Sequence, residues 1–422
     1  MKPASHDAFA ALRHRDFSIV TINQFCLTLA ILIQEVIVAY ALYRLTRDPL
    51  VLGLIGLAEA IPFIALSLWG GYFADRFNRQ IIMQICMLFA LPMPLVLSGL
   101  FTGFEQGHLS QSQLALGVYG IIFVLGTIRG FYNPSVSSLK PFLVPRALYP
   151  NAATWTTIGW QSAVVLGPVT GGFLLGYAGL HLTLYLVTGL LLVCSVLLAL
   201  LKKRQFPPIN HDSVWLSLQE GFSFIFKTKI VFWSISLDLV SVLFGGVIAL
   251  LPIYAEDILK VGAEGLGILR AAPSVGALLM MALLAKYQPT RHAWRNMLLA
   301  VAGFGIFTLV FAFSKTMWLS LLALGLTGAF DSISVVIRQT ILQIFPPENL
   351  RGRVAAVNGM FVSSSNELGA FESGVAARYL TVIPATILGG SITLLVAILT
   401  YFKTRDLLKV DVEHSKPAEV KE

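Results

Sequence analysis

The chain has 422 residues, of which 56% are hydrophobic and 12% are charged, and its mean hydropathy is +0.77. About a quarter of the residues of a soluble domain are charged, so this composition argues against a soluble enzyme, and its high hydrophobicity argues against a disordered chain. The net charge of +8 does not indicate nucleic-acid binding, because the Lys and Arg residues lie in short loops between apolar stretches. The chain is therefore predicted to be a polytopic helical membrane protein without a large soluble domain.

Hydropathy predicts about twelve membrane spans. An apolar helix of roughly 20 residues crosses a bilayer, so twelve use roughly 240 residues and leave the rest for loops, a linker and a tail. About 16 polar residues precede the first span. Because this span is longer than the hydrophobic core of a signal peptide, no cleaved leader is expected. The predicted spans are 17–43, 51–73, 80–102, 114–138, 151–177, 181–201, 229–254, 263–286, 296–314, 316–341, 353–380 and 382–402.

The cations predict how the chain is threaded. With twelve spans both termini lie on one side of the membrane, and 23 of the 30 Lys and Arg residues fall on that side. Five fall on the opposite side, and two, Arg129 and Arg270, fall within spans. Because cytoplasmic loops are enriched in Lys and Arg, both termini are predicted to be cytoplasmic.

The longest connection, 202–228, separates two sets of six spans. Its segment 214–226 mixes large apolar and polar residues and could form an amphipathic helix at the membrane surface. An ungapped offset of 202 residues aligns 126–174 with 328–376 with eight identities in 49 positions. We therefore predict an N-terminal six-helix bundle in 1–201, a linker in 202–228, a second six-helix bundle in 229–405 and a polar tail in 406–422. Such duplicated halves are typical of transporters that rock around a central site.

A glycine pair followed by charged residues ends the second span: Gly70-Gly71-Tyr72-Phe73-Ala74-Asp75-Arg76-Phe77-Asn78-Arg79. This segment resembles the loop signature of the major facilitator superfamily, G-x-x-x-D-R-x-x-R-R, and departs from it at Gln80. The resemblance implies an all-α integral membrane fold with twelve transmembrane helices in two pseudo-symmetric six-helix bundles. It also implies that Asp75 contacts the start of span eleven when the cytoplasmic side is closed, as a carboxylate near a helix N-terminus and arginines would. A basic loop that only sets topology is the alternative. The predicted gating residues are Gly70, Gly71, Asp75, Arg76, Arg79, Arg351 and Arg353.

Span five holds a run of small residues around a proline. The residues Gly167, Pro168, Gly171 and Gly172 resemble the antiporter signature of the same superfamily, although Gly159 lies too early for the full pattern. In that family the signature accompanies exporters. An ordinary close helix contact through small residues is the alternative interpretation.

Two shorter stretches narrow the resemblance. The segment from Gln339 to Gly359 and the opening Leu12-Arg13-His14-Arg15-Asp16-Phe17 are similar to the enterobactin-exporter-like and macrolide-efflux branch of the superfamily. That branch implies a proton-driven exporter of a bulky, partly apolar molecule such as a siderophore or a drug. A lysophospholipid or metabolite transporter stays open as an alternative.

Charged residues inside membrane spans indicate function because they are costly there. A carboxylate in a span can load and release a proton as access alternates, and the candidates for this role are Glu35, Glu59, Asp238, Asp331 and Glu367. Arg129 and Asp331 are equivalent under the 202-residue offset, so they could form a salt bridge that breaks and reforms, and Arg270 is a further cation for such pairs. Static pairing that holds the halves in register is the alternative.

Aromatic and amide side chains on the predicted spans suit a large amphipathic ligand. The candidate cavity residues are Asn23, Gln24, Tyr40, Trp160, Gln161, Asn358 and Asn366. Each could equally face lipid or pack against another helix.

Motifs for enzymatic chemistry are absent from the sequence. It contains no P-loop, no H-E-x-x-H and no nucleophile elbow, and the three cysteines lie in apolar stretches without a neighbouring histidine. We therefore expect no enzyme activity, no metal and no cofactor, with the proton gradient as the energy source. We also expect a small-molecule substrate, a surrounding bilayer, no nucleic acid, no ATPase subunit, a monomer and a place in the bacterial inner membrane.

Overall fold

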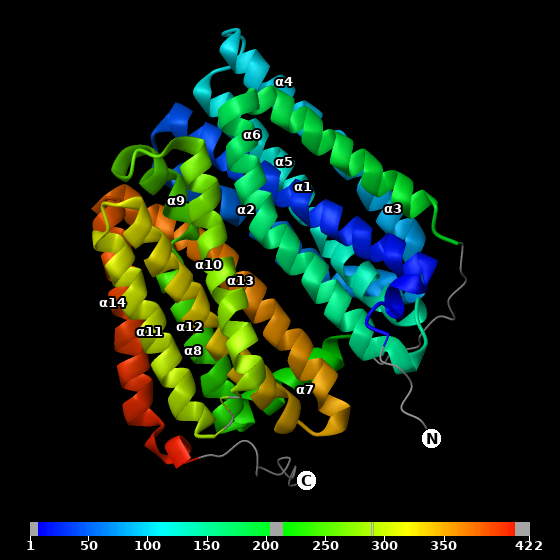
Figure 1. Ribbon diagram of the computed structural model, residues 1–422, viewed down its shortest axis with the longest axis vertical. Coiled ribbons are helices and arrows are strands. Elements are labelled where there is room, and N and C mark those ends of the chain that lie inside the picture. Colours follow the sequence, from blue (N-terminus) through cyan, green and yellow to red (C-terminus); the bar gives the residue numbers. More distant parts are fainter. Residues whose placement is uncertain (1–6, 203–213, 288, 290, 410–422) are drawn as a thin grey trace. The chain divides into compact units, whose positions relative to one another are not determined.

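The computed structural model describes residues 7–202, 214–287, 289 and 291–409 (Figure 1). The described chain is helical throughout and contains no strand. Residues 203–213 of the predicted linker and 410–422, most of the predicted tail, lie outside the described residues. The chain divides into two compact units, which are described in turn: 1–41 with 61–210, and 42–60 with 211–422.

The first unit is built from the first six α-helices of the chain. They are α1 (Arg15–Thr46), α2 (Pro49–Arg76), α3 (Arg79–Ala90), α4 (Met93–Glu105), α5 (Gln111–Leu139) and α6 (Tyr149–Ala199), with short 3-10 turns at η1 (Ala11–Arg13), η2 (Lys140–Phe142) and η3 (Arg146–Leu148). The end of α1 and the start of α2 belong to the second unit. The buried core of the first unit is apolar and comes mainly from α1, α3, α5 and α6.

Local sequence explains where these helices begin and break. Asn78 caps α3 by accepting a hydrogen bond from the backbone of Gln80, and Ser110 forms a capping box with Gln113 at the start of α5. Pro92 follows the end of α3, so the third predicted span consists of α3 and α4. In α6 the backbone turns at Gly179, whose φ of 76° suits a residue without a side chain.

The second unit contains the remaining helices. They are α7 (Val214–Lys227), α8 (Lys229–Gly245), η4 (Ile248–Leu250), α9 (Leu251–Ile253), the π-helical turn η5 (Tyr254–Ile258), α10 (Gly262–Lys286), α11 (Ala293–Phe313), α12 (Met317–Ile344), α13 (Glu348–Leu380), α14 (Val382–Lys403) and η6 (Arg405–Lys409). In Figure 1, α12 and α14 both lie alongside α11, and α12 also packs against α10.

Glycines set the closest approach in this unit. A Cβ added to Gly276 on α10 would lie 1.7 Å from the carbonyl oxygen of Gly325 on α12, and one added to Gly328 would lie 1.9 Å from that of Pro273. The two backbones therefore touch, as small residues allow in membrane helices.

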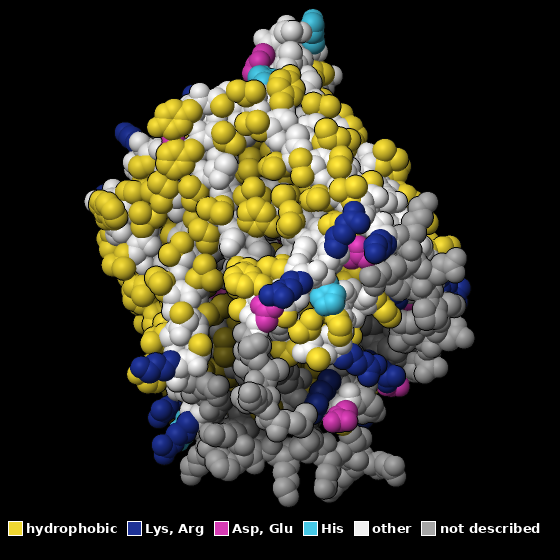
Figure 2. All heavy atoms as spheres, turned by 45° about the vertical axis from the view of Figure 1, so that its right-hand side comes forward, with side chains coloured by type: hydrophobic (Ala, Val, Ile, Leu, Met, Phe, Trp, Pro, Cys, Tyr) yellow, Lys and Arg dark blue, Asp and Glu magenta, His cyan; other side chains and the backbone are white. Residues whose placement is uncertain are grey.

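Ten of the described helical segments are long and apolar enough to cross a membrane. One of them, 146–199, holds two predicted spans joined at the Gly179 turn. Helix α13 has 33 residues but is not among the ten, because serines, amides and acids lower its hydropathy. The helices are consistent with twelve crossings, and hydrophobic side chains cover most of the described surface shown in Figure 2.

Candidate functional site

A buried ion pair joins α8 and α12 in the second unit. Arg338 donates a hydrogen bond to the Asp238 carboxylate, and the two residues are 2% and 3% exposed. A charge away from water needs a partner, and a carboxylate with a guanidinium is a strong one. We name Asp238, Arg338, Asp331, Ser241 and Ser334 the Asp238 cluster.

A small cavity opens beside this pair, with room for about one water molecule. Asp331 faces it from α12, seven residues before Arg338 and thus on the same side of the helix. Among the described residues Asp331 forms no ion pair. The cavity is lined by Asp238, Ser241, Val242, Ala300, Val301, Phe304, Phe330, Asp331 and Ser334. Two carboxylates and two hydroxyls line this water-sized space, and a carboxylate there can take up a proton.

Arg338 is a site residue that sequence reasoning missed. Near the end of a predicted span, it was counted with the cations of the cytoplasmic side, and the structure buries it within α12. The spacing of seven residues from Asp331 was the signal, because it places both side chains on one helix face.

The other predicted charged residues lie on elements other than α8 and α12. In the first unit, Arg129 lies over the ring of Phe63 with its guanidinium carbon 4.9 Å from the ring centre. A bond between Arg129 and Asp331 would join the two units and stays a prediction. Glu35 lies on α1, Glu59 on α2, Arg270 on α10 and Glu367 on α13, where the Glu367 carboxylate lies next to Gly56 of α2.

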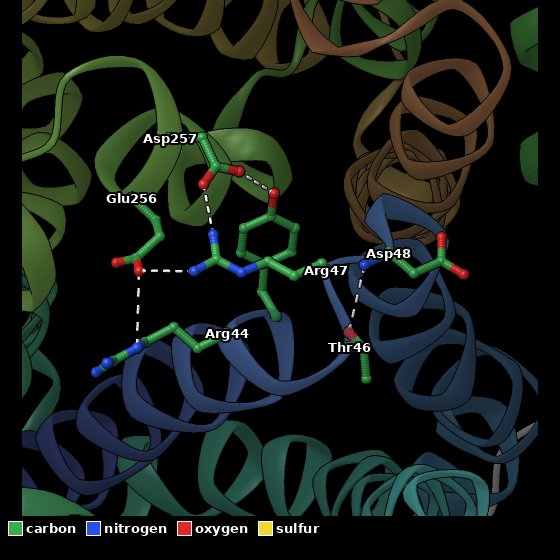
Figure 3. Close-up of polar contacts among 7 residues, drawn as sticks. Arg44, Thr46, Arg47, Asp48, Glu256 and Asp257 are labelled. Atoms are coloured by element: carbon green, nitrogen blue, oxygen red, sulfur yellow. Dashed lines mark hydrogen bonds and ion pairs between the residues drawn. The ribbon is translucent and has the colours of Figure 1, made fainter.

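A second polar site, which sequence reasoning missed, surrounds Arg47 in the second unit. The Arg47 guanidinium lies 2.5 Å from an Asp257 oxygen and 3.1 Å from a Glu256 oxygen (Figure 3). Tyr43 also donates to Asp257, and Arg44 lies 3.7 Å from Glu256. We name Tyr43, Arg44, Arg47, Glu256 and Asp257 the Arg47 cluster.

The backbone around the Arg47 cluster explains how its charges meet. Arg47 has a φ of 52°, which turns the chain between α1 and α2, and the two neighbouring acids lie in the π-helical turn η5. The next residue, Asp48, pairs with Arg378 at the end of α13. Desolvation works to lower the pKa of Arg47, but Asp257 and Glu256 outweigh it and raise that pKa above its ordinary value. The only sequence signal was two adjacent acids and two arginines in loops, without a pattern that pairs them.

The predicted gating loop is tightly packed in the first unit. A Cβ on Gly70 would lie 2.1 Å from the carbonyl oxygen of Gly130, so α2 and α5 touch there, whereas Gly71 has open space. Arg79 is 1% exposed, donates to the Ala74 carbonyl over 3.0 Å and lies 3.8 Å from Asp75. Arg79 therefore closes the turn between α2 and α3, while Arg76 lies over the ring of Tyr72.

Arg351 and Arg353, the expected partners of Asp75, lie at the start of α13 in the second unit. Arg351 donates to the Pro346 carbonyl over 3.3 Å, and Arg353 pairs with Glu220 of α7. A Cβ on Gly221 would lie 3.0 Å from the Arg353 carbonyl oxygen, so α7 lies directly on α13. Their contact with Asp75 would join the two units and stays a prediction.

The antiporter-like residues lie between α6 and α1. Cβ atoms on Gly167 and Gly171 would lie 2.7 Å from Leu32 Cβ and 3.1 Å from Ile33 Cα, and Pro168 and Gly172 are also buried. These residues thus allow a close helix contact, which was the alternative interpretation; their link with export stays a prediction.

The candidate cavity residues lie in different environments. Asn23 is 0% exposed, donates to the Cys194 carbonyl over 2.8 Å and accepts from the Tyr132 hydroxyl over 2.5 Å. Tyr40, Gln161 and Asn358 are buried, Gln24 is half-buried and Trp160 is exposed. Asn366 is exposed and donates to the Val362 carbonyl of its own helix. None of these residues lines the small cavity beside Asp238, and no metal-binding group of three occurs among the described residues. Their role in a substrate cavity stays a prediction.

Comparison with known proteins identifies the family. A family model described as "Transmembrane secretion effector", of the major facilitator class, matches residues 6–421. The chain belongs to the major facilitator superfamily. It is therefore a multi-pass membrane transporter of small molecules and not an enzyme, and such transporters generally need no cofactor.

Relatives and solved structures agree with this membership. The chain is 27% identical over 333 residues to the multidrug resistance protein MdtG of Serratia proteamaculans, covering 77% of each chain. It is 25% identical over 321 residues to MdtG of Escherichia fergusonii, covering 75% of each. The fold is similar to the POT family transporter PepTSo (TM-score 0.73, 13% identity, 93% of this chain and 98% of that chain) and to the nucleoside transporter NupG (TM-score 0.69, 15% identity, 94% and 99%).

Proposed function

We propose that this chain is a proton-driven exporter of bulky amphipathic drug-like molecules in the bacterial inner membrane. The observation that carries the proposal is the Asp331 carboxylate, which faces a small cavity beside the buried Asp238–Arg338 pair. The relatives named multidrug resistance proteins support the cargo class, because they align with three quarters of the chain.

Asp331 is the best of the five predicted acids for the coupling role. The charge of Asp238 is balanced by Arg338, so the ionised form of Asp238 is stabilised without a proton. Glu35, Glu59 and Glu367 each interact with other groups. Asp331 lacks an ion pair among the described residues, and uptake of a proton removes a charge that is costly in the membrane. Release of that proton on the other side would complete the cycle.

The Arg47 cluster would act as a latch in the same cycle. On the predicted topology it lies at the outer side of the membrane. Residues 42–60 come from the first six predicted spans but pack in the second unit. If the two halves of the sequence rock, these ion pairs break and reform once in each cycle.

The direct experiment is transport in proteoliposomes. Wild-type vesicles loaded with a fluorescent amphipathic dye should extrude it when the outside is acidified, and a protonophore should stop the extrusion. Asp331→Asn should abolish extrusion driven by the gradient but keep dye exchange without a gradient, because exchange needs no net proton movement. Glu105→Gln, an exposed acid at the end of α4, is the matched control and should keep both activities.

Each outcome bears on a different part of the proposal. Gradient-driven extrusion by Asp331→Asn at the wild-type rate would show that Asp331 does not couple. Absence of dye transport by the wild type would contradict the drug-like cargo. Retention of a catecholate siderophore in cells that lack the protein under iron limitation would then favour siderophore export, and lysophospholipid movement would favour a lipid transporter.

A further inference from the structure

An exposed platform of cations and aromatic rings lies where α8 begins and α14 ends. We name its members, Lys229, Trp233, Tyr401, Phe402, Lys403 and Arg405, the Lys403 platform. The Lys403 ammonium lies 5.9 Å from the centre of the Trp233 ring, which joins the two helices. The Arg405 guanidinium lies 4.8 Å from the ring of Phe402 and 5.8 Å from that of Tyr401.

The backbone under this platform is held rigidly. Thr404, between the two cations, is fully buried and accepts a hydrogen bond from the indole of Trp294 over 2.8 Å. Its hydroxyl also donates to the Thr400 carbonyl over 2.6 Å. Lys403 and Arg405 therefore flank a buried residue whose position is fixed by hydrogen bonds. The backbone beneath both cations loses little conformational freedom when they bind a ligand.

Charge in this platform is only partly balanced. Lys229 pairs with Asp406 over 2.7 Å, and its hydrogen bond to that carboxylate holds the pKa of Asp406 below its ordinary value, so Asp406 is charged at neutral pH. Among the described residues no carboxylate pairs with Lys403 or Arg405. The aromatic rings contact one face of the Lys403 and Arg405 cations, so the remaining N–H groups of these cations can donate hydrogen bonds to a ligand.

We propose that the Lys403 platform binds the headgroup of an anionic phospholipid. The exposed rings of Tyr401 and Phe402, at the end of a membrane helix, would contact the glycerol and upper acyl region, as aromatic side chains do at membrane interfaces. Lys403 and Arg405 would donate to the phosphate, and cations next to a membrane helix attract anionic lipid. Asp406 limits the affinity because it occupies Lys229 and repels the phosphate.

The experiment is native mass spectrometry of the purified full chain with increasing phosphatidylglycerol, and with phosphatidylcholine as the neutral comparison. Lys403→Gln with Arg405→Gln should weaken phosphatidylglycerol binding about thirtyfold, the effect of two cations near a lipid surface. Asp406→Asn should strengthen it, because Lys229 is freed. Lys315→Gln, an exposed cation between α11 and α12, should leave it unchanged.

Two further measurements separate the sources of phosphate and the effects of folding. Soluble glycerol phosphate, added at the same concentration as the lipid, should not displace phosphatidylglycerol. Displacement would show that the site binds a free phosphate. Lys403→Arg with Arg405→Lys, which keeps both charges, should restore lipid binding. Equal binding by the wild type and the double glutamine variant, or weaker binding by Asp406→Asn, would overturn the proposal.

Discussion

Asn23 shows how a polar residue in a membrane protein can hold several helices together. It lies on α1 without exposure and bonds to Tyr132 on α5 and Cys194 on α6. The sequence predicted it as a cavity residue, because an amide in an apolar span suggests a ligand contact. A helix-packing role is an equally good reason for an amide there, and only the positions of Tyr132 and Cys194 distinguish the two.

We predict that Asn23→Leu destabilises the protein without changing substrate preference. The Tyr132 hydroxyl would lose its acceptor and the Cys194 carbonyl would lose one donor, and a buried group left unsatisfied costs about 1–3 kcal/mol. Thermal unfolding in detergent measures the loss, with Asn366→Leu as a control because Asn366 is exposed. An unchanged unfolding temperature together with an altered cargo range would instead support the cavity role.

The close packing of α10 on α12 depends on which glycines of the two helices face each other. Gly276 and Gly328 face backbone carbonyls at distances that no side chain can occupy. Glycines in both predicted spans were visible in the sequence, but which of them meet a neighbouring backbone depends on how each helix is rotated. Gly359 on α13, by contrast, has nothing within 4 Å of its Cβ position.

We predict that Gly276→Ala lowers stability by about 2 kcal/mol or more, because overpacking forces the backbones apart. Gly328→Ala should act in the same way. Gly359→Ala should be tolerated or stabilising, because alanine favours a helix and meets no neighbour there. Yield of folded protein and its unfolding temperature test all three, and equal stability of Gly276→Ala and Gly359→Ala would contradict the packing argument.

At the scale of the whole molecule, the division into units does not follow the sequence halves completely. Residues 42–60 lie in the first six predicted spans, yet they pack in the second unit through the Arg47 cluster and the Asp48–Arg378 pair. Glycine contacts between α2 and α13 add to this, since a Cβ on Gly53 would lie 3.1 Å from Gly374 Cα. Ion pairs and glycine contacts hold residues 42–60 in this unit. Such contacts can separate without breaking an apolar core.

We predict that Glu256→Gln with Asp257→Asn loosens this segment. Hydrogen exchange of residues 43–60 and 254–258 should become faster, and high salt should move the wild type towards the variant, because Arg47 is half exposed and exposed pairs are screened. Arg13→Ala, which breaks an exposed pair with Asp7, is the control and should leave this exchange unchanged. Unaltered exchange in the double variant would show that the cluster does not hold the segment.

The sequence by itself determined the helical membrane class, because apolar stretches of span length have no other stable fold in a bilayer. It also determined membership of the major facilitator superfamily, since the residues around Asp75 resemble a distinctive signature. Most span positions followed from hydropathy. Helix α13 was also predicted as a span, because loops delimit it on both sides. Its hydropathy is lower than that of the ten segments that are apolar enough to cross a membrane.

Only the tertiary structure decided which charges act together. Asp238 and Arg338 are 100 residues apart, and Arg47 and Asp257 are 210 apart. Hydropathy and local spacing report which side chains share a helix face, but pairing across helices depends on the rotation and depth of each one. Those are set by the whole packed unit, by glycine contacts such as Gly276 with Gly325, and therefore cannot be read from any single segment.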